Sequence, residues 1–224
     1  NHTITFQSPK PCHFLLPGKI NTGELSVVDI GIPKKIFKEV KKSSNIFLNT
    51  SDLWKNHFPW PKEHDHKYSR GHLLVQSGDQ FSTGASRLAS LSALRIGAGV
   101  VTLASSDEAA LINASHLTSV MIKNINNISD FINFSKNRKV TSLLIGPGCG
   151  VTDYTKKLSL NIIELGLPVV LDADALSVFK DDPDELFSCI KKYNNNVILT
   201  PHEGEFNRIF KDTKGSKLSV TRDA

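Results

Sequence analysis

The residues best suited to chemistry stand in four short segments, each of which follows an apolar run. The most distinctive is Gly146-Pro147-Gly148-Cys149-Gly150, which comes directly after Leu143-Leu144-Ile145. Glycines at the end of a buried strand let backbone N–H groups point into open space, and a helix starting at Thr152-Asp153 would add unpaired N–H groups and its positive end. This combination predicts a site for a phosphate or another anion. The alternative is a tight turn that needs glycine for its backbone angles and binds nothing.

Two carboxylates, Asp172 and Asp174, follow the apolar run Pro168 to Leu171. One hypothesis is that either carboxylate holds a metal-bound phosphate or a ligand hydroxyl. The other is that they cap the helix expected to begin at Asp174. The sequence leaves both open.

His202 and Glu205 follow Thr200-Pro201 and are spaced three residues apart, as metal ligands on a helix can be. No second histidine follows at helical spacing, so zinc is not expected, and we predict no metal held by side chains alone. Pro201 favours an extended backbone at Thr200, which predicts a neutral His202 that donates a hydrogen bond to a ligand. The fourth segment is Ser77-Gly78-Asp79 with Thr83-Gly84-Ala85, where Thr83 is expected to cap a helix.

These segments need a scaffold, and the chain from residue 67 alternates between strand and helix patterns. Expected strands are 72–76, 100–104, 120–122, 143–145, 168–172 and 197–200. Expected helices are 84–96, a short one that opens at 105–108, 128–136, 153–165, one that starts at 174–176, 203–210 and 217–224; in the first of them Ala85, Leu88, Ala89, Ser92, Ala93 and Ile96 share one face. This order predicts an α/β fold with a mainly parallel sheet covered by helices on both faces. All four segments then lie at the carboxyl ends of strands, where such sheets bind ligands.

Composition narrows the class of protein. The net charge of +5 is spread out, and its densest run, Lys34 to Lys42, is interpreted as a solvated face; we therefore expect no nucleic acid partner. The cysteines Cys12, Cys149 and Cys189 are odd in number and lack metal spacing, which favours reduced thiols and a cytoplasmic protein. Cys149 is interpreted as a small filler. No run is long enough for a transmembrane helix, so no membrane is expected.

The segments, taken in order, resemble the ADP- or ATP-dependent NAD(P)H-hydrate dehydratases. The blocks that carry the resemblance are Lys67 to Val75, Thr83-Gly84-Ala85, Ala93 to Val101, Ile145 to Gly150, Val170 to Leu176 and Leu199 to Phe206. Residues 3–6, Lys10 and 23–33 resemble the closing strands of an NAD(P)H-hydrate epimerase domain. The resemblance implies a ribokinase-like fold and three regions: 1–33 as an epimerase-like tail, 34–66 as a connector and 67–224 as the N-terminal part of a dehydratase domain.

The resemblance also implies an activity. Its members remove water from a hydrate of NADH or NADPH by converting the ring hydroxyl into a phosphate ester that then leaves, with ADP or ATP as the phosphate donor and Mg²⁺ as its expected companion. Carried over, Ala85, Gly148, Gly150, His202 and Glu205 would contact the hydrate. Asp172 and Asp174 would line the pocket without an assigned role.

Several departures from the family pattern leave alternatives open. Ser77-Gly78-Asp79 replaces the usual Gly-Gly-Ser, and Tyr68 replaces a glycine. The Gly-Thr-Gly-Asp block that holds the catalytic aspartate does not occur up to Ala224, so we assign no catalytic residue and expect the fold to be incomplete at its C-terminus. Because the chain also begins at Asn1, it is interpreted as a piece of a longer product. The expected partner is a complementing C-terminal chain or a second copy; the alternatives are a non-catalytic remnant that binds a dinucleotide or a partner, and a small-molecule kinase of the same fold.

Overall fold

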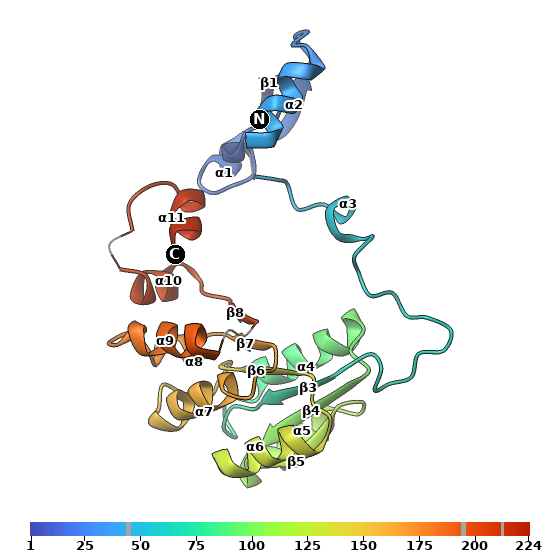
Figure 1. Cartoon of the computed structure of the whole chain (residues 1–224), viewed down its shortest axis with the longest axis vertical. Coiled ribbons are helices and arrows are strands. Elements are labelled where there is room, and N and C mark those ends of the chain that lie inside the picture. The colour runs from blue at the N-terminus through green and yellow to red at the C-terminus, as the bar shows by residue number, and fades with distance from the viewer. Residues whose placement is uncertain (44–45, 194–195, 212) are drawn as a thin grey trace. The chain divides into compact units, whose positions relative to one another are not determined.

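The computed structural model describes residues 1–43, 46–193, 196–211 and 213–224, without the side chains of Lys34, Lys38 and residues 41–43. The chain divides into two compact units, Asn1–Pro59 and Trp60–Ala224, whose elements are labelled in Figure 1. Neither unit contains, among its described residues, a helix long and apolar enough to cross a bilayer. The proposed boundaries at residues 33 and 66 stay predictions.

The first unit is built on a pair of parallel strands. β1 (His2–Phe6) pairs with β2 (Glu24–Val28), and the crossover contains the short helices η1 (Pro11–His13) and α1 (Gly18–Thr22). The Lys10 ammonium donates to the Thr5 hydroxyl and to the carbonyls of Phe6 and Ser8 at 2.7–2.8 Å, which closes the turn after β1. Helices α2 (Lys34–Ser43) and α3 (Ser51–Trp54) follow.

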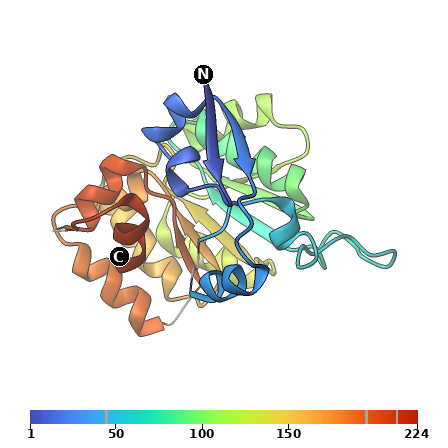
Figure 2. The ribbon, with the colours of Figure 1, turned by 90° about the horizontal axis from the view of Figure 1, so that it is seen from above.

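The second unit contains a six-stranded, fully parallel sheet in the order β5-β4-β3-β6-β7-β8. Its strands are β3 (His72–Gln76), β4 (Val100–Ser105), β5 (Met121–Asn124), β6 (Ser142–Ile145), β7 (Val169–Leu171) and β8 (Val197–Leu199). Its helices are α4 (Gly84–Ile96), α5 (Asp107–His116), α6 (Ile128–Asn137), α7 (Asp153–Ile163), α8 (Asp174–Ser177), α9 (Pro183–Tyr193), α10 (Glu203–Ile209) and α11 (Lys217–Asp223). The strands lie side by side in the views of Figures 1 and 2. The predicted alternation of strands and helices is confirmed.

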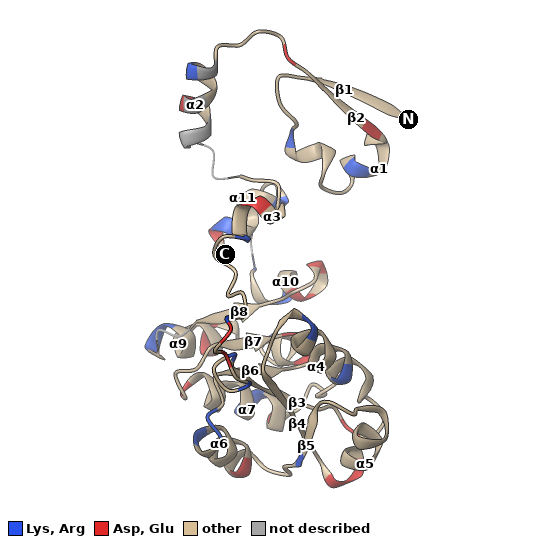
Figure 3. Ribbon diagram, turned by 90° about the vertical axis from the view of Figure 1, so that its right-hand side faces the viewer, with Lys and Arg blue, Asp and Glu red and all other residues tan. Residues whose placement is uncertain are grey.

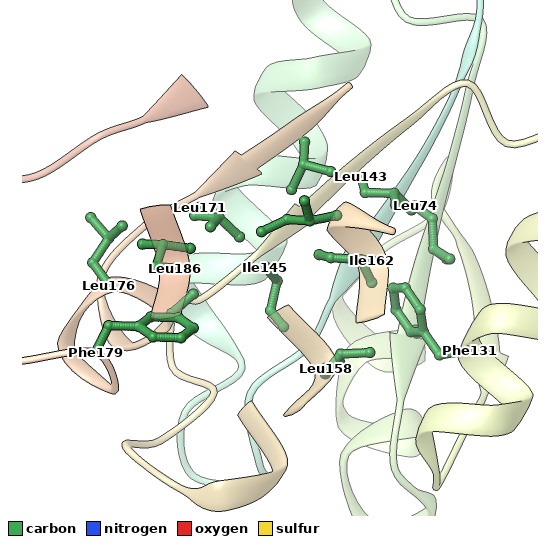
Figure 4. Close-up of a cluster of buried hydrophobic side chains, with 14 of the residues drawn as sticks. Leu74, Phe131, Leu143, Ile145, Leu158, Ile162, Leu171, Leu176, Phe179 and Leu186 are labelled. Atoms are coloured by element: carbon green, nitrogen blue, oxygen red, sulfur yellow. The ribbon is translucent and has the colours of Figure 1, made fainter. Parts of the chain in front are cut away.

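Successive strand residues point to opposite faces, and each face has its own apolar core. On one face Leu74, Leu143, Ile145 and Leu171 pack against helical side chains that include Phe131 of α6 and Leu158 of α7 (Figure 4). On the other face Val75, Val101 and Leu103 pack against Ala93 and Leu94 of α4. Helices therefore cover both faces, as the sequence predicted.

Helix α4 buries a different face from the expected one. Ser86 and Ser90 are fully buried, whereas Leu88 and Ile96 are 68% and 65% exposed. The Ser86 hydroxyl donates to the Thr83 carbonyl at 3.0 Å, and the Ser90 hydroxyl donates to the Ser86 carbonyl at 2.8 Å. Because the hydroxyls are satisfied within the helix, their small side chains let α4 lie close to the sheet. Leu88 and Ile96 of the expected apolar stripe face outward, whereas Ala93 of the same stripe packs on the sheet.

The lysines and arginines of the second unit are distributed over separate helices, which Figure 3 shows in blue. The predicted lysine-rich run lies in and next to α2, where the side chains of Lys34, Lys38, Lys41 and Lys42 lie outside the described residues. The expectation of a solvated face there stays a prediction.

His72, at the start of β3, gives the unit a pH-dependent stability. Its Nδ1–H donates to the Arg138 carbonyl at 3.0 Å, and its Nε2 lies 2.8 Å from the Thr102 hydroxyl, which can donate to the neutral ring. Burial lowers the pKa of His72 from its ordinary value of 6.5. The unfolded chain then binds more protons than the folded one below about pH 6.5, so stability is lost as the pH falls through that window.

We therefore expect the free energy of unfolding, measured by denaturant titration, to fall between about pH 7 and pH 5 in the native chain. His72→Gln, which keeps a donor and an acceptor, should lose the part of this slope that His72 causes. An identical slope in the two proteins would contradict the assignment.

Candidate functional site

The topology places the candidate site at the carboxyl edge of the sheet. From β3 the chain moves outward through β4 and β5, then returns to the other side of β3 with β6 and continues through β7 to β8. The loops after β3 and β6 therefore leave in opposite directions, and in open parallel sheets the crevice at such a switch point binds ligands. The four segments singled out in the sequence lie along this edge.

The loops after β3 and β6 are locked together by glycine. A Cβ on Gly78 would lie 2.3 Å from the Gly148 carbonyl oxygen, and a Cβ on Gly148 would lie 2.4 Å from the Ser82 carbonyl oxygen. Backbone packs on backbone here, which no other residue allows without movement. Gly148 also has a positive φ of 72°. The close approach expected of Gly148 is thus made within the chain.

Three N–H groups in and next to the glycine loop make hydrogen bonds within the chain. The Cys149 N–H donates to the Gly146 carbonyl at 3.0 Å, the Gly150 N–H donates to Asp174 Oδ2 at 2.8 Å, and the Thr152 N–H donates to the Gly150 carbonyl at 3.1 Å. Thr152 also caps α7 through the Thr155 N–H, as its sequence suggested. These three N–H groups are therefore engaged within the chain, and the phosphate site expected at this loop stays a prediction.

Asp172 and Asp174 connect the loops instead of capping α8. The residue at the N-cap of α8 is Ala173, with a φ of 47°, and no side chain caps that helix. Asp174 accepts from Gly150, and Asp172 Oδ1 accepts from the Thr200 hydroxyl at 2.8 Å. The carboxylates thus tie the ends of β6 and β8 to the end of β7. Capping, the alternative that the sequence left open, is not observed.

His202 and Glu205 form a capping box at the start of α10. His202 Nδ1 accepts from the N–H groups of Gly204 and Glu205, so the proton of the neutral ring lies on Nε2, 3.2 Å from Glu205 Oε1. The other carboxylate oxygen of Glu205 accepts from the His202 N–H at 2.9 Å. His202 remains 67% exposed while Glu205 is only 8% exposed. Its Nε2–H is therefore directed at Glu205 in this structure, and the expected donation to a ligand would require that bond to be exchanged.

The first turn of α4 lies at the other end of the edge. Thr83 already has helical backbone angles and its side chain makes no capping hydrogen bond, so the expected Thr83 cap is wrong. The N–H groups of that turn are the kind of donor that binds an anion, and Ala85 is exposed beside them. Three strand spacings separate β3 from β8, or roughly 14 Å.

The structure also brings in residues that the sequence reasoning missed. Ser82 packs on Gly148, the Thr200 hydroxyl holds Asp172, and Asn113 of α5 reaches Ser77. Asn113 is fully buried in the middle of α5. The sequence shows an asparagine at this position but does not show that it is buried.

Cys149 is chemically quiet, in agreement with its interpretation as a filler. Burial of the thiol raises the pKa of Cys149 to about 12, with a smaller contribution from the nearby Asp174 carboxylate. At about pH 8 only on the order of one thiol in 10,000 would be ionised. We expect a thiol-reactive dye to label the exposed Cys12 rapidly and Cys149 at least about a hundredfold more slowly. Mass spectrometry after timed labelling would locate the label, and Cys12→Ser is the control; early label on Cys149 would contradict the assignment.

No group of three histidine, cysteine or acidic side chains suited to a metal ion occurs in the part of the chain that the structure describes. Mg²⁺ bound to nucleotide phosphates needs only one or two carboxylates. Asp172 and Asp174 are the carboxylates at this edge that could provide them.

The fold has solved counterparts. A ribokinase-like superfamily protein from Enterococcus faecalis aligns with a TM-score of 0.60 at 18% identity, over 75% of this chain and 59% of that one. The ADP/ATP-dependent NAD(P)H-hydrate dehydratase from Bacillus subtilis, co-crystallised with ATP and Mg²⁺, aligns with a TM-score of 0.58 at 24% identity, over 74% of this chain and 56% of that one. The chain thus has the predicted ribokinase-like α/β fold.

The sequence comparisons define the family more narrowly. The family model of NAD(P)H-hydrate dehydratase matches residues 73–224. The bifunctional NAD(P)H-hydrate repair enzyme of Coxiella burnetii is 35% identical over 213 residues, and that of Dictyoglomus turgidum is 29% identical over 223 residues. This chain therefore belongs to the NAD(P)H-hydrate dehydratase family, and the resemblance inferred from its motifs is confirmed. The matches cover 93% and 95% of this chain but only 40% and 42% of those two proteins.

Proposed function

We propose that the protein to which this chain contributes repairs nicotinamide nucleotides by removing water from the S-hydrate of NADH or NADPH, at the expense of ADP or ATP. The observation that carries the proposal is that the chain belongs to the dehydratase family and that its four polar segments follow β3, β6, β7 and β8 at the carboxyl edge of one sheet. Family membership favours this activity over a small-molecule kinase of the same fold.

Hydroxide is a poor leaving group, and the bound nucleotide would supply a phosphate that turns the ring hydroxyl into a better one. The residues of this chain would bind the dinucleotide and orient its nicotinamide ring. The first turn of α4, with Ala85, would bind the anionic pyrophosphate of the dinucleotide. Gly148 and Gly150 would form a flat wall against the nicotinamide half, and His202 and Glu205 would close the far end. Asp172 and Asp174 keep that wall in place and are the residues that would hold Mg²⁺ with the nucleotide.

Recovery of reduced nicotinamide from the hydrate, measured with ADP or ATP and Mg²⁺, tests the activity on this chain together with a C-terminal dehydratase segment of the kind its relatives contain. Ala85→Glu, which adds a carboxylate where the pyrophosphate would lie, should reduce kcat/KM at least about tenfold. Ala114→Glu, at an exposed alanine of α5 away from this turn, is the matched control and should leave it unchanged. Absence of turnover from the combined protein would overturn the proposal; calorimetric binding of the hydrate without turnover would support a binding protein instead.

The outward stripe of α4 supports a partner for this site. Leu88 and Ile96 are exposed, and Ile198 of β8, 59% exposed, points to the same face of the sheet because its neighbours Val197 and Leu199 pack on the other. We propose that a C-terminal dehydratase segment covers this stripe. A cytoplasmic location, consistent with the three free cysteines, is part of the same proposal.

Co-expression of the chain with such a segment, followed by affinity purification of one of them, tests the partner. Leu88→Glu with Ile96→Glu should abolish co-purification, because a buried charge is costly at an apolar interface. Leu111→Glu, at a 79% exposed leucine of α5, is the control and should have no effect. Self-association of the chain that the double variant removes would point to a second copy instead, and unchanged co-purification would contradict this surface.

A further inference from the structure

A buried polar cluster lies behind the loop after β3 and is not used by the proposed chemistry. Asn113 Nδ2 donates to the Ser77 hydroxyl and to the Ser105 hydroxyl, each at 2.9 Å. The Ser77 hydroxyl also lies 3.5 Å from that of Ser86. Asn113, Ser86 and Ser105 are fully buried and Ser77 is 3% exposed. This Ser77 cluster (Ser77, Ser86, Ser105 and Asn113) joins α4, α5 and the ends of β3 and β4.

Ser77 links this cluster to the two loops of the candidate site. Its N–H donates to the Ala104 carbonyl at 2.8 Å, and its own carbonyl accepts from Gln76 Nε2 at 3.0 Å and faces Cys149 Sγ at 4.0 Å. The loop that begins at Ser77 then packs on Gly148 through Gly78 and Ser82 and leads into α4 and Ala85. The position of both site loops therefore depends on where Ser77 is held.

Asn113 is a costly way to fill this space. Its Oδ1 is buried and has no hydrogen-bond partner among the described residues, and the same is true of Gln76 Oε1. A buried polar atom without a partner is destabilising, so an apolar side chain would serve packing alone at least as well. The benefit of the amide lies in its two directed bonds, which fix Ser77 and Ser105 relative to each other.

We propose that Asn113 is a positioning residue of the candidate site, acting through Ser77 on the loop 77–83 and, through Gly78 and Ser82, on the glycine loop 146–150. The effect on ligand binding rests on the proposed function, whereas the effect on the loops does not. Asn113 touches neither substrate nor nucleotide.

Hydrogen exchange of the ligand-free chain tests the loops directly. Asn113→Leu should raise the exchange rates of the amides of Ser77, Ser82 and Cys149 at least about tenfold, because each closes a hydrogen bond within or beside the two loops. The amides of Leu143 and Asp172, which bond within the sheet, should be unaffected. Ser90→Ala, which removes a buried hydroxyl of α4 away from the loop, is the matched control and should change neither set.

A double variant separates positioning from general stability. Ser77→Gly should loosen the same loops, and adding Asn113→Leu to it should have no further effect, because both changes remove one connection. Additive effects, unchanged loop exchange in Asn113→Leu, or an equal rise at Leu143 and Asp172 would overturn the proposal. If Asn113→Leu does not fold, Asn113→Ala takes its place, and unfolding of both would show a purely structural role.

Titration calorimetry with the NADPH hydrate adds the ligand measurement. Asn113→Leu should weaken binding of the hydrate about tenfold. The Ser90→Ala control should keep the affinity and the melting temperature of the native chain. If the native chain binds no hydrate, the proposed function is contradicted. If Asn113→Leu nevertheless loosens the loops, the role of Asn113 in positioning them is still supported.

Discussion

Gly146→Ala is expected to destabilise the Trp60–Ala224 unit by about 3 kcal/mol or more, or to prevent its folding. Gly146 has a φ of 129°, and a Cβ there would lie 1.7 Å from the Asp172 carbonyl oxygen and 3.0 Å from Ala175 Cβ. Both atoms belong to the segment that follows β7, so the loop after β6 could accept the methyl group only by moving away from β7. Urea unfolding followed by circular dichroism measures the change.

Gly84→Ala is the matched control for Gly146→Ala. A methyl group on Gly84 would meet no described atom within 4 Å, its φ is not positive, and it begins α4. The change should be neutral or stabilise by roughly 0.5 kcal/mol, since alanine restricts the unfolded chain. Equal losses in the two variants would contradict the packing argument at Gly146.

The second large effect is expected from Asp174→Ala, which leaves the Gly150 N–H without its acceptor. A hydrogen bond to a charged group contributes roughly 1.5–3 kcal/mol, and the partial exposure of Asp174 places the expected loss near the lower end. The glycine loop would also lose its link to α8, so affinity for the dinucleotide should fall about tenfold or more.

Denaturant titration and calorimetry measure the two parts of this prediction. Asp174→Asn is the control, because an amide oxygen can still accept from Gly150; stability should stay within about 0.5 kcal/mol of the native value. If Asp174→Ala loses neither stability nor affinity, the carboxylate does not hold this wall.

Much of the fold of the second unit was predictable because its signals are local. The apolar runs at 143–145 and 168–171 and the glycines and prolines that follow them indicate parallel strands whatever the neighbours are. Helix α5 begins at its Ser106 cap and α7 at its Thr152 cap, where a short polar side chain bonds the next turn. The family followed from the order of the motifs.

The burial of α4 was not predictable in the same way. Periodicity favoured the apolar stripe with Leu88 and Ile96, yet the sheet receives Ser86 and Ser90. Whether a helix buries small hydroxyls or large apolar groups depends on how closely its partner approaches, and the partner is defined only by the tertiary structure. The same holds for Thr83, which stands at the N-cap of α4 but whose side chain makes no capping hydrogen bond.

By itself, the sequence determined the alternating α/β order, the edge of the sheet that carries the candidate site, and the dehydratase family, because strand runs, turn glycines and motif order are properties of neighbouring residues. Only the tertiary structure decided what these residues do at that edge. It bonded Asp174 to Gly150 and Asp172 to Thr200, closed His202 onto Glu205, and placed Asn113 behind Ser77. Each of these is a contact whose partners are fixed by packing between elements, and hydrogen bonds of this kind carry no signature in local sequence.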